Sequence, residues 1–267
     1  MRRVLLLTGI LGFLAGEAGA WPEDVMKALN RDARRLLPRS LAKLLAERET
    51  QVLAELRRFP APVSQAMAGD LQGGRLSQET AAALDAETSQ VVEMLRHQRV
   101  TEGLVRLGSL LRIPADLADP VLSAGPEGYP PGVVREYYAF VSTNLAKIPV
   151  VLDDPDSLKL GRRELPRYWQ GLVDRSRPQS PVLRTELFRN GKVVSYKTID
   201  FRSPVYGVAS LSYSRAVTGI AATWLAVWRD ARGDLTRTPS PRAVHPRDAP
   251  PIPGAGRVPQ TATTEQR

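Results

Sequence analysis

The chain contains no cysteine and only two histidines, His97 and His245, among its 267 residues. Without cysteine no disulfide bond can form, so the fold has to be stabilised by a buried core. Zinc sites in proteins draw mainly on cysteine sulfur and histidine nitrogen, and three or more such ligands have to meet. The composition therefore argues against a conventional zinc site. We expect His97 to lie at a helix end, where the dipole favours a positive charge, and His245 to lie in a polar tail.

Long apolar runs are also scarce, and the one that stands out is at the N-terminus. The first three residues include two arginines, residues 4–15 are apolar, and residues 18–20 form a small-x-small cleavage pattern. This order predicts a secretory signal peptide over residues 1–20, with Trp21 first in the mature chain. The alternative is an uncleaved anchor, but the run is shorter than the roughly 20 apolar residues that span a bilayer. We expect a periplasmic or extracellular protein that is not an integral membrane protein after cleavage.

Acidic residues are outnumbered by basic ones. The 37 Lys and Arg against 28 Asp and Glu give a formal net charge of +9. A basic exported protein is suited to anionic partners such as lipid, a cell-wall polymer or a nucleic acid. The alternative is that the arginines, which are scattered beside Asp and Glu, lie on solvated helix faces. We favour the second interpretation, with an anionic partner as the alternative.

Apolar residues recur at spacings of three and four over residues 21–151, which predicts a series of amphipathic helices. One of these covers residues 40–56, and another opens at Ser77. A final helix is expected over residues 205–231, with Trp224 and Trp228 four residues apart as core packing. The pattern predicts an all-α fold with one multi-helix domain over residues 21–235.

Two segments depart from the helical pattern. Residues 183–189 and 193–201 flank Asn190-Gly191, a strong signal for a two-residue hairpin turn. We therefore expect one small β-hairpin near residues 183–201. Residues 236–267 are polar and proline-rich without periodicity, which predicts a disordered tail.

One short motif carries a family resemblance. Arg112, Asp116, Pro120 and Leu122 follow one another with the spacing of H-x-x-x-D-x-x-x-P-x-H, the aspartate and proline kept and both histidines replaced. This spacing resembles the signature of the zinc-dependent phospholipase C and single-strand-specific nuclease superfamily. Trp21 adds to the likeness, because mature chains of that family begin with tryptophan.

The resemblance implies a nearly all-helical exported fold in which three metal ions hydrolyse phosphate esters. In that family the amine and carbonyl of the first tryptophan bind a metal, and a histidine follows five residues later in the nuclease branch. Here that later position holds methionine. The positions that the resemblance assigns to the ancestral site are Trp21, Met26, Arg112, Asp116, Asp119, Leu122 and Glu136. Trp21 and Asp116 are the expected ligands if zinc or another divalent cation is retained.

The departures from the family's motif argue against its activity, and no catalytic residue is assigned. Arg112 brings a permanent positive charge to a ligand position, while Met26 and Leu122 offer soft or no donors. A single hard cation held by Asp116, Asp119 and backbone oxygens is one interpretation. We favour the other, in which Arg112 replaces the ion as the partner of Asp116 one helical turn away, and no cofactor is bound.

Three functions compete on this evidence. The leading hypothesis is a catalytically inactive, exported helical protein of phospholipase C/nuclease-like type that acts in binding. The second is a phosphodiester hydrolase with a rebuilt metal site, in which Arg112 holds a phosphate through its planar fork. The third is a cell-envelope adaptor that binds an anionic polymer or lipid. The candidate partners are thus anionic lipid, a cell-wall polymer or another phosphate-containing ligand.

Overall fold

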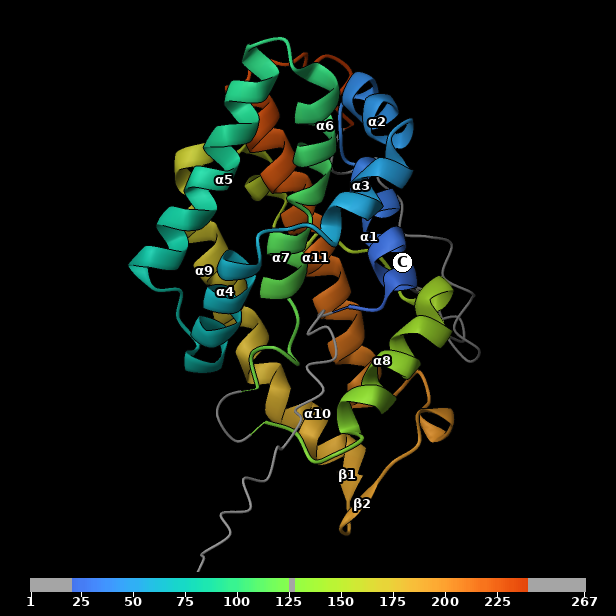
Figure 1. The fold of residues 1–267 in the computed structure, drawn as a ribbon. Helices are drawn as coiled ribbons and strands as arrows, with labels where there is room; N and C mark the ends of the chain where they lie inside the picture. The colour runs from blue at the N-terminus through green and yellow to red at the C-terminus, as the bar shows by residue number, and fades with distance from the viewer. Residues whose placement is uncertain (1–20, 125–127, 240–267) are drawn as a thin grey trace, which may run out of the picture.

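The structure is a computed structural model that describes residues 21–124 and 128–239 (Figure 1). The expected signal peptide, His245 and all but the first four residues of the expected tail lie outside the described residues. The described chain is predominantly helical, with one two-stranded sheet, so the all-α prediction is confirmed. None of the described helices combines the length and the apolar character needed to cross a membrane.

A single long helix, α11 (Pro204–Asp230), forms the axis of the fold. Ser203 caps it by accepting a hydrogen bond from the Tyr206 backbone N–H, and proline occupies the first position of the helix, where its missing N–H costs nothing. Residues 212–227 are all buried except Arg215, which is partly buried. A helix that is apolar on every side has to be covered on every side. The helices α1, α5, α7, α9 and α10 pack around it (Figure 1).

The chain before the motif region forms four helices, α1 (Glu23–Arg34), α2 (Arg39–Ala46), α3 (Glu49–Leu56) and α4 (Ala61–Gly73). The single helix expected over residues 40–56 is therefore wrong, because it breaks between α2 and α3. Arg48 has a non-helical backbone there, with φ −111° and ψ 12°. The break lets Leu41 and Leu45 on one side, and Val52 and Leu56 on the other, all reach the core.

The next helices are α5 (Gln78–Arg96), α6 (Val100–Ser109), α7 (Arg112–Leu117) and α8 (Val133–Asn144). Ser77 accepts a hydrogen bond from the Thr80 backbone N–H, so the predicted start of α5 is confirmed. His97 follows the last residue of α5 and is exposed, as expected. Its Nε2 lies 3.1 Å from a carboxylate oxygen of Glu93.

The expected hairpin is present but much shorter than predicted. Its strands are β1 (Phe188–Arg189) and β2 (Lys192–Val193), paired antiparallel across Asn190-Gly191, both with positive φ. Residues 183–187 belong instead to α10 (Ser180–Leu187), since Leu183 and Leu187 are four residues apart and both are buried. The second expected strand gives way to the 3₁₀ turn η5 (Tyr196–Thr198).

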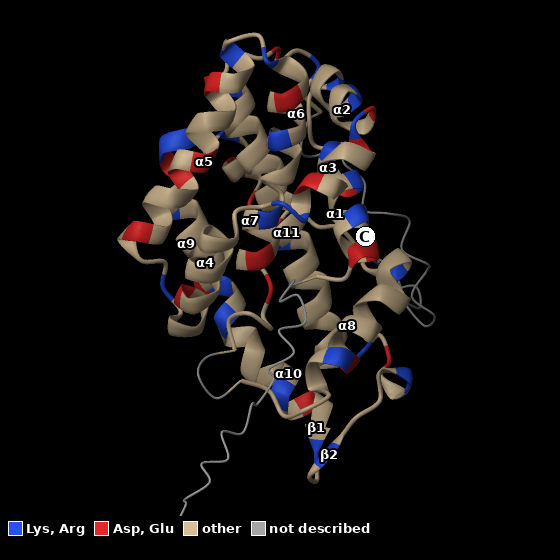
Figure 2. Ribbon diagram, viewed as in Figure 1, with Lys and Arg blue, Asp and Glu red and all other residues tan. Residues whose placement is uncertain are grey.

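The remaining elements lie between α8 and α10 in the chain. They are η1 (Leu145–Lys147), η2 (Pro155–Lys159), η3 (Arg162–Glu164), α9 (Leu165–Ser176) and η4 (Arg177–Gln179). Trp224 on α11 is fully buried, as the core-packing interpretation expects, while Trp228 is partly buried and donates its indole N–H to the Asp234 carbonyl. Residues of both charge signs are interspersed over the surface (Figure 2), as on solvated helix faces.

The crossing of α11 with α7 and α9 depends on Gly219. A Cβ added there would lie 2.8 Å from the Cβ of Pro114 and 3.1 Å from Cδ1 of Leu172.

We expect Gly219→Ala to lower the free energy of unfolding by about 1–3 kcal/mol, because the ring of Pro114 cannot turn away. Denaturant titration measures this. Gly69→Ala on exposed α4, where a Cβ meets nothing within 4 Å, should be neutral or stabilising by up to about 1 kcal/mol. Equal effects at both positions would contradict the packing argument.

Candidate functional site

The short helix α7 carries Arg112 and Asp116, the first two residues of the motif on which the resemblance depends. Arg112 and Asp116 are one turn apart, and Nε of Arg112 lies 3.1 Å from Oδ2 of Asp116. The side chain of Asp116 is 5% exposed and that of Arg112 is 19% exposed. The second carboxylate oxygen of Asp116, Oδ1, is buried with no hydrogen-bond partner among the described residues. The favoured interpretation, an ion pair between these two residues, is what the structure contains.

Asp119 follows α7 and is completely buried. Its Oδ1 accepts a hydrogen bond of 2.8 Å from the Val121 backbone N–H, and its Oδ2 accepts one of 2.8 Å from the hydroxyl of Tyr138 on α8. Both carboxylate oxygens are therefore satisfied by the protein itself. Tyr138 was not among the predicted site residues, because the helical pattern of α8 places its neighbour Tyr137, and not Tyr138, on the core face.

Trp21 lies against α7 and α8, although it is far from both in the sequence. Its indole N–H donates a hydrogen bond of 2.9 Å to the Ala115 carbonyl of α7. Its ring centroid lies 6.1 Å from that of Tyr138 and 6.3 Å from that of Tyr137. The structure thus brings Trp21, Arg112, Asp116 and Asp119 together. We call these four residues and Tyr138 the buried acidic cluster.

The other three predicted positions have separate environments. Met26 is buried in the core from α1, and Leu122 is partly buried against the same core. Glu136 lies in the first turn of α8, accepts a hydrogen bond of 3.0 Å from the Tyr196 backbone N–H, and lies 3.2 Å from Arg135. Its partners thus belong to η5 and to α8 itself, and it shares none of them with Asp116 or Asp119.

Burial dominates the electrostatics of the cluster. It raises the pKa of Asp116 to about 6, although the positive charge of Arg112 opposes this shift. Burial raises the pKa of Asp119 to about 7, against the lowering effect of the hydrogen bonds from Val121 and Tyr138, with a further increase from the nearby charge of Asp116. The environment therefore favours a proton on Asp119 near neutral pH.

This donor set does not fit the zinc cluster that the family resemblance implies. Among the described residues, no three side chains of His, Cys, Asp or Glu come together as a metal site. The one buried carboxylate oxygen without a partner belongs to Asp116, whose other oxygen is held by Arg112. A divalent cation would have to displace the guanidinium and the Tyr138 hydroxyl to gain two ionised carboxylates.

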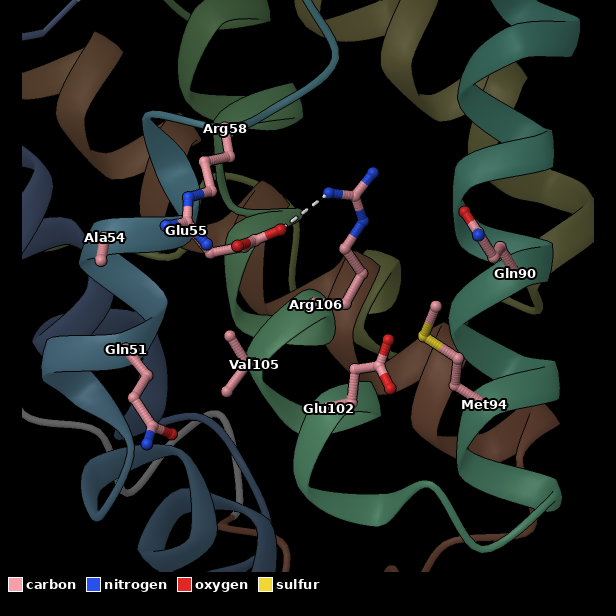
Figure 3. Close-up of a pocket in the computed structure, with 9 residues that line it drawn as sticks. All are labelled: Gln51, Ala54, Glu55, Arg58, Gln90, Met94, Glu102, Val105 and Arg106. Atoms are coloured by element: carbon pink, nitrogen blue, oxygen red, sulfur yellow. Dashed lines mark hydrogen bonds and ion pairs between the residues drawn. The ribbon is translucent and has the colours of Figure 1, made fainter.

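A second candidate site is an open cleft of about 480 Å³ between α3 and α5, with α6 at its base (Figure 3). It is lined by Gln51, Ala54 and Glu55 of α3, by Arg58 just after α3, by Gln90 and Met94 of α5, and by Glu102, Val105 and Arg106 of α6. Arg106 lies 3.1 Å from Glu55 and 2.6 Å from Glu87, so it links the two walls. No sequence motif pointed to this cleft, whose size is in the range of small-ligand pockets.

Comparison with known proteins identifies no relative: no family model, no curated protein and no solved structure matches the chain. The interpretation of the site therefore depends on its own geometry.

The raised carboxyl pKa values predict an unusual dependence of stability on pH. Between about pH 4 and pH 7 the folded chain holds protons on Asp119 and Asp116 that the unfolded chain has released. The free energy of unfolding should therefore fall as pH rises from about 5 to about 7, by up to about 1.4 kcal/mol per pH unit for each carboxyl. Urea titrations at several pH values measure this slope.

Asp119→Asn should reduce that slope, because the amide does not titrate and can still accept from Val121 and donate to Tyr138. Asp156→Asn is the control, since Asp156 is exposed and its pKa is lowered by Lys159. It should leave the slope between about pH 5 and pH 7 unchanged. A slope that survives Asp119→Asn in full would show that another group is responsible.

Proposed function

We propose that this chain is an exported, catalytically inactive helical protein that acts by binding, on a scaffold of the phospholipase C/nuclease-like type. The observation that carries the proposal is the ion pair between Arg112 and Asp116, at positions where the resembled enzymes hold metal ligands. The arginine cannot be deprotonated in a protein, so its positive charge stands permanently where a cation would bind.

The surroundings of the ion pair support the same proposal. The two carboxylate oxygens of Asp119 accept hydrogen bonds from the Val121 backbone N–H and the Tyr138 hydroxyl. The indole N–H of Trp21 donates to the Ala115 carbonyl. With Arg112 positive, Asp116 ionised and Asp119 protonated, the cluster is close to electrically neutral without a metal. A divalent cation would add two charges and remove hydrogen bonds of about 1–3 kcal/mol each.

A binding role is also supported by the cleft between α3 and α5. It is open to solvent at the surface and presents both charged and amide side chains, with Val105, Ala54 and Met94 between them. Six of its nine lining residues are polar, so it suits a polar or charged small ligand better than an apolar one.

Metal content tests the proposal directly. We expect the protein, purified without a metal-affinity step and dialysed against zinc, to contain far less than one zinc per chain by elemental analysis. We also expect a chelator to leave its thermal unfolding unchanged, and no chelator-sensitive hydrolysis of phosphatidylcholine or single-stranded nucleic acid. Two or more zinc ions per chain, or a hydrolysis that Asp116→Ala abolishes, would overturn the proposal in favour of the hydrolase alternative.

Replacement of Arg112 tests the role of its charge. Arg112→Met leaves Asp116 buried without its countercharge, so the free energy of unfolding should fall by about 3 kcal/mol at neutral pH. The loss should be smaller near pH 5, where Asp116 is protonated. The double variant Arg112→Met with Asp116→Leu is the matched control. It should recover most of the stability, because an apolar pair of similar volume often replaces a buried ion pair without loss. Added zinc that rescues Arg112→Met alone would contradict the proposal.

A further inference from the structure

The exposed apolar side chains are concentrated at one end of α11. Four large hydrophobic residues are exposed in the described chain, and three of them are Val151 (57% exposed), Phe201 (47%) and Leu211 (46%). The fourth, Val100, begins α6 elsewhere in the fold. Exposed apolar residues that occur singly need no explanation, whereas a group of them on one face does.

These three residues lie along the N-terminal half of α11. Phe201 lies three residues before Pro204, the first residue of α11, and Pro204, Gly207 and Leu211 are all exposed at the spacing of one helix face. The Val151 backbone N–H donates a hydrogen bond of 3.1 Å to the hydroxyl of Ser214, which lies one turn beyond Leu211. We call Phe201, Leu211 and Val151 the apolar line.

The end of the apolar line at Phe201 is surrounded by positive charge. Nζ of Lys147 lies 4.6 Å from the centre of the Phe201 ring, Arg202 is the next residue, and Lys197 is exposed in η5. None of these three cations has a carboxylate within 4 Å among the described residues. Two carboxylates lie nearby: Asp200 of the same loop, whose Oδ1 accepts from the Arg202 backbone N–H, and Glu136, whose pKa the positive charge of Lys197 helps to lower.

The other end of the apolar line carries little net charge. Asp153, two residues after Val151, lies 3.3 Å from Arg175 and 3.4 Å from Arg215, so its charge is compensated. The face therefore has an apolar body and a cationic end, which is the arrangement of segments that lie in a membrane interface.

We propose that this face docks the protein on the surface of an anionic phospholipid bilayer. Phe201 and Leu211 enter the boundary between headgroups and acyl chains, while Lys147, Lys197 and Arg202 lie over the lipid phosphates. Two weak signals act together, apolar insertion and attraction of the cations by the negative surface potential. The docking uses residues outside the buried acidic cluster and the cleft, so it stands or fails separately from the proposed function.

A lipid surface fits this face better than a protein partner does. Stable protein interfaces bury roughly 20–30 residues on each side, and the apolar line offers three large side chains. A nucleic acid would contact the cations but would leave Leu211 and Val151 in water. A bilayer uses both parts, because its interface contains anionic headgroups above apolar chains.

Co-flotation of the purified protein with vesicles tests the proposal. We expect binding to vesicles of phosphatidylcholine with phosphatidylglycerol, weak binding to phosphatidylcholine alone, and a decrease as salt rises to the physiological range. Phe201→Ser with Leu211→Ser should weaken binding at least about tenfold. Lys147→Gln, Lys197→Gln and Arg202→Gln together should weaken it about 100-fold, at roughly fivefold for each charge.

Two matched controls distinguish binding through this face from nonspecific hydrophobic and nonspecific electrostatic binding. Val100→Ser removes an equally exposed apolar residue from another place, and Arg35→Gln, Arg39→Gln and Lys43→Gln together remove three exposed cations around α2. Both controls should bind vesicles like the unaltered protein. Equal losses in a control and its matched variant would overturn the proposal. So would equal binding to neutral vesicles, or a dimer in solution that Leu211→Ser converts to a monomer.

Discussion

Burial of residues 212–227 of α11 is the constraint on which the rest of the fold depends, because a helical segment without a polar face is stable only when neighbours cover all of it. Five helices provide that cover, and they approach closely where α11 presents small side chains such as Gly219. Close approach brings α7 deep into the molecule, where Ile113, Pro114 and Leu117 are fully buried or nearly so. The polar residues of α7 are drawn inside with them, and this is why Asp116 is in the core.

Charged groups placed in this way need partners inside the protein, since removing a carboxylate from water without compensation costs several kcal/mol. The fold provides them from distant helices. Tyr138 of α8 donates to Asp119, and Tyr213 of α11 donates to the buried carboxylate of Asp32 on α1 over a distance of 2.7 Å. A tyrosine hydroxyl suits this role because its ring packs in the apolar core while its O–H reaches the carboxylate. The buried aspartates thereby fix which helices can lie side by side.

The parts of the structure that the sequence predicts are those that depend on local spacing. The helix that starts after Ser77, the axis near residues 205–231 and the turn at Asn190-Gly191 follow from caps, apolar periodicity and turn chemistry. The ion pair of Arg112 with Asp116 follows from a spacing of one helical turn. The break at Arg48 and the helical state of residues 183–187 do not, because tertiary packing of Val52, Leu183 and Leu187 decides them. The contact of Trp21 with Ala115 and the bond of Tyr138 to Asp119 join distant segments, which no local pattern encodes.

The charges of the buried acidic cluster differ from those that a metal site needs. A trinuclear metal site needs an opening through which phosphate esters reach the ions, and it needs several ionised ligands around them. Here Arg112 supplies the positive charge permanently, Tyr138 and Val121 occupy Asp119, and the raised pKa of Asp119 reduces the negative charge available to a cation. These charges compensate one another without a metal, although Oδ1 of Asp116 has no hydrogen-bond partner among the described residues. Exposed side chains are not constrained in this way, because they change at little cost in stability. The exposed Phe201 is such a position: its ring contacts Lys147 and the ring of Tyr206 but remains 47% exposed, and a contact outside the chain would cover the rest.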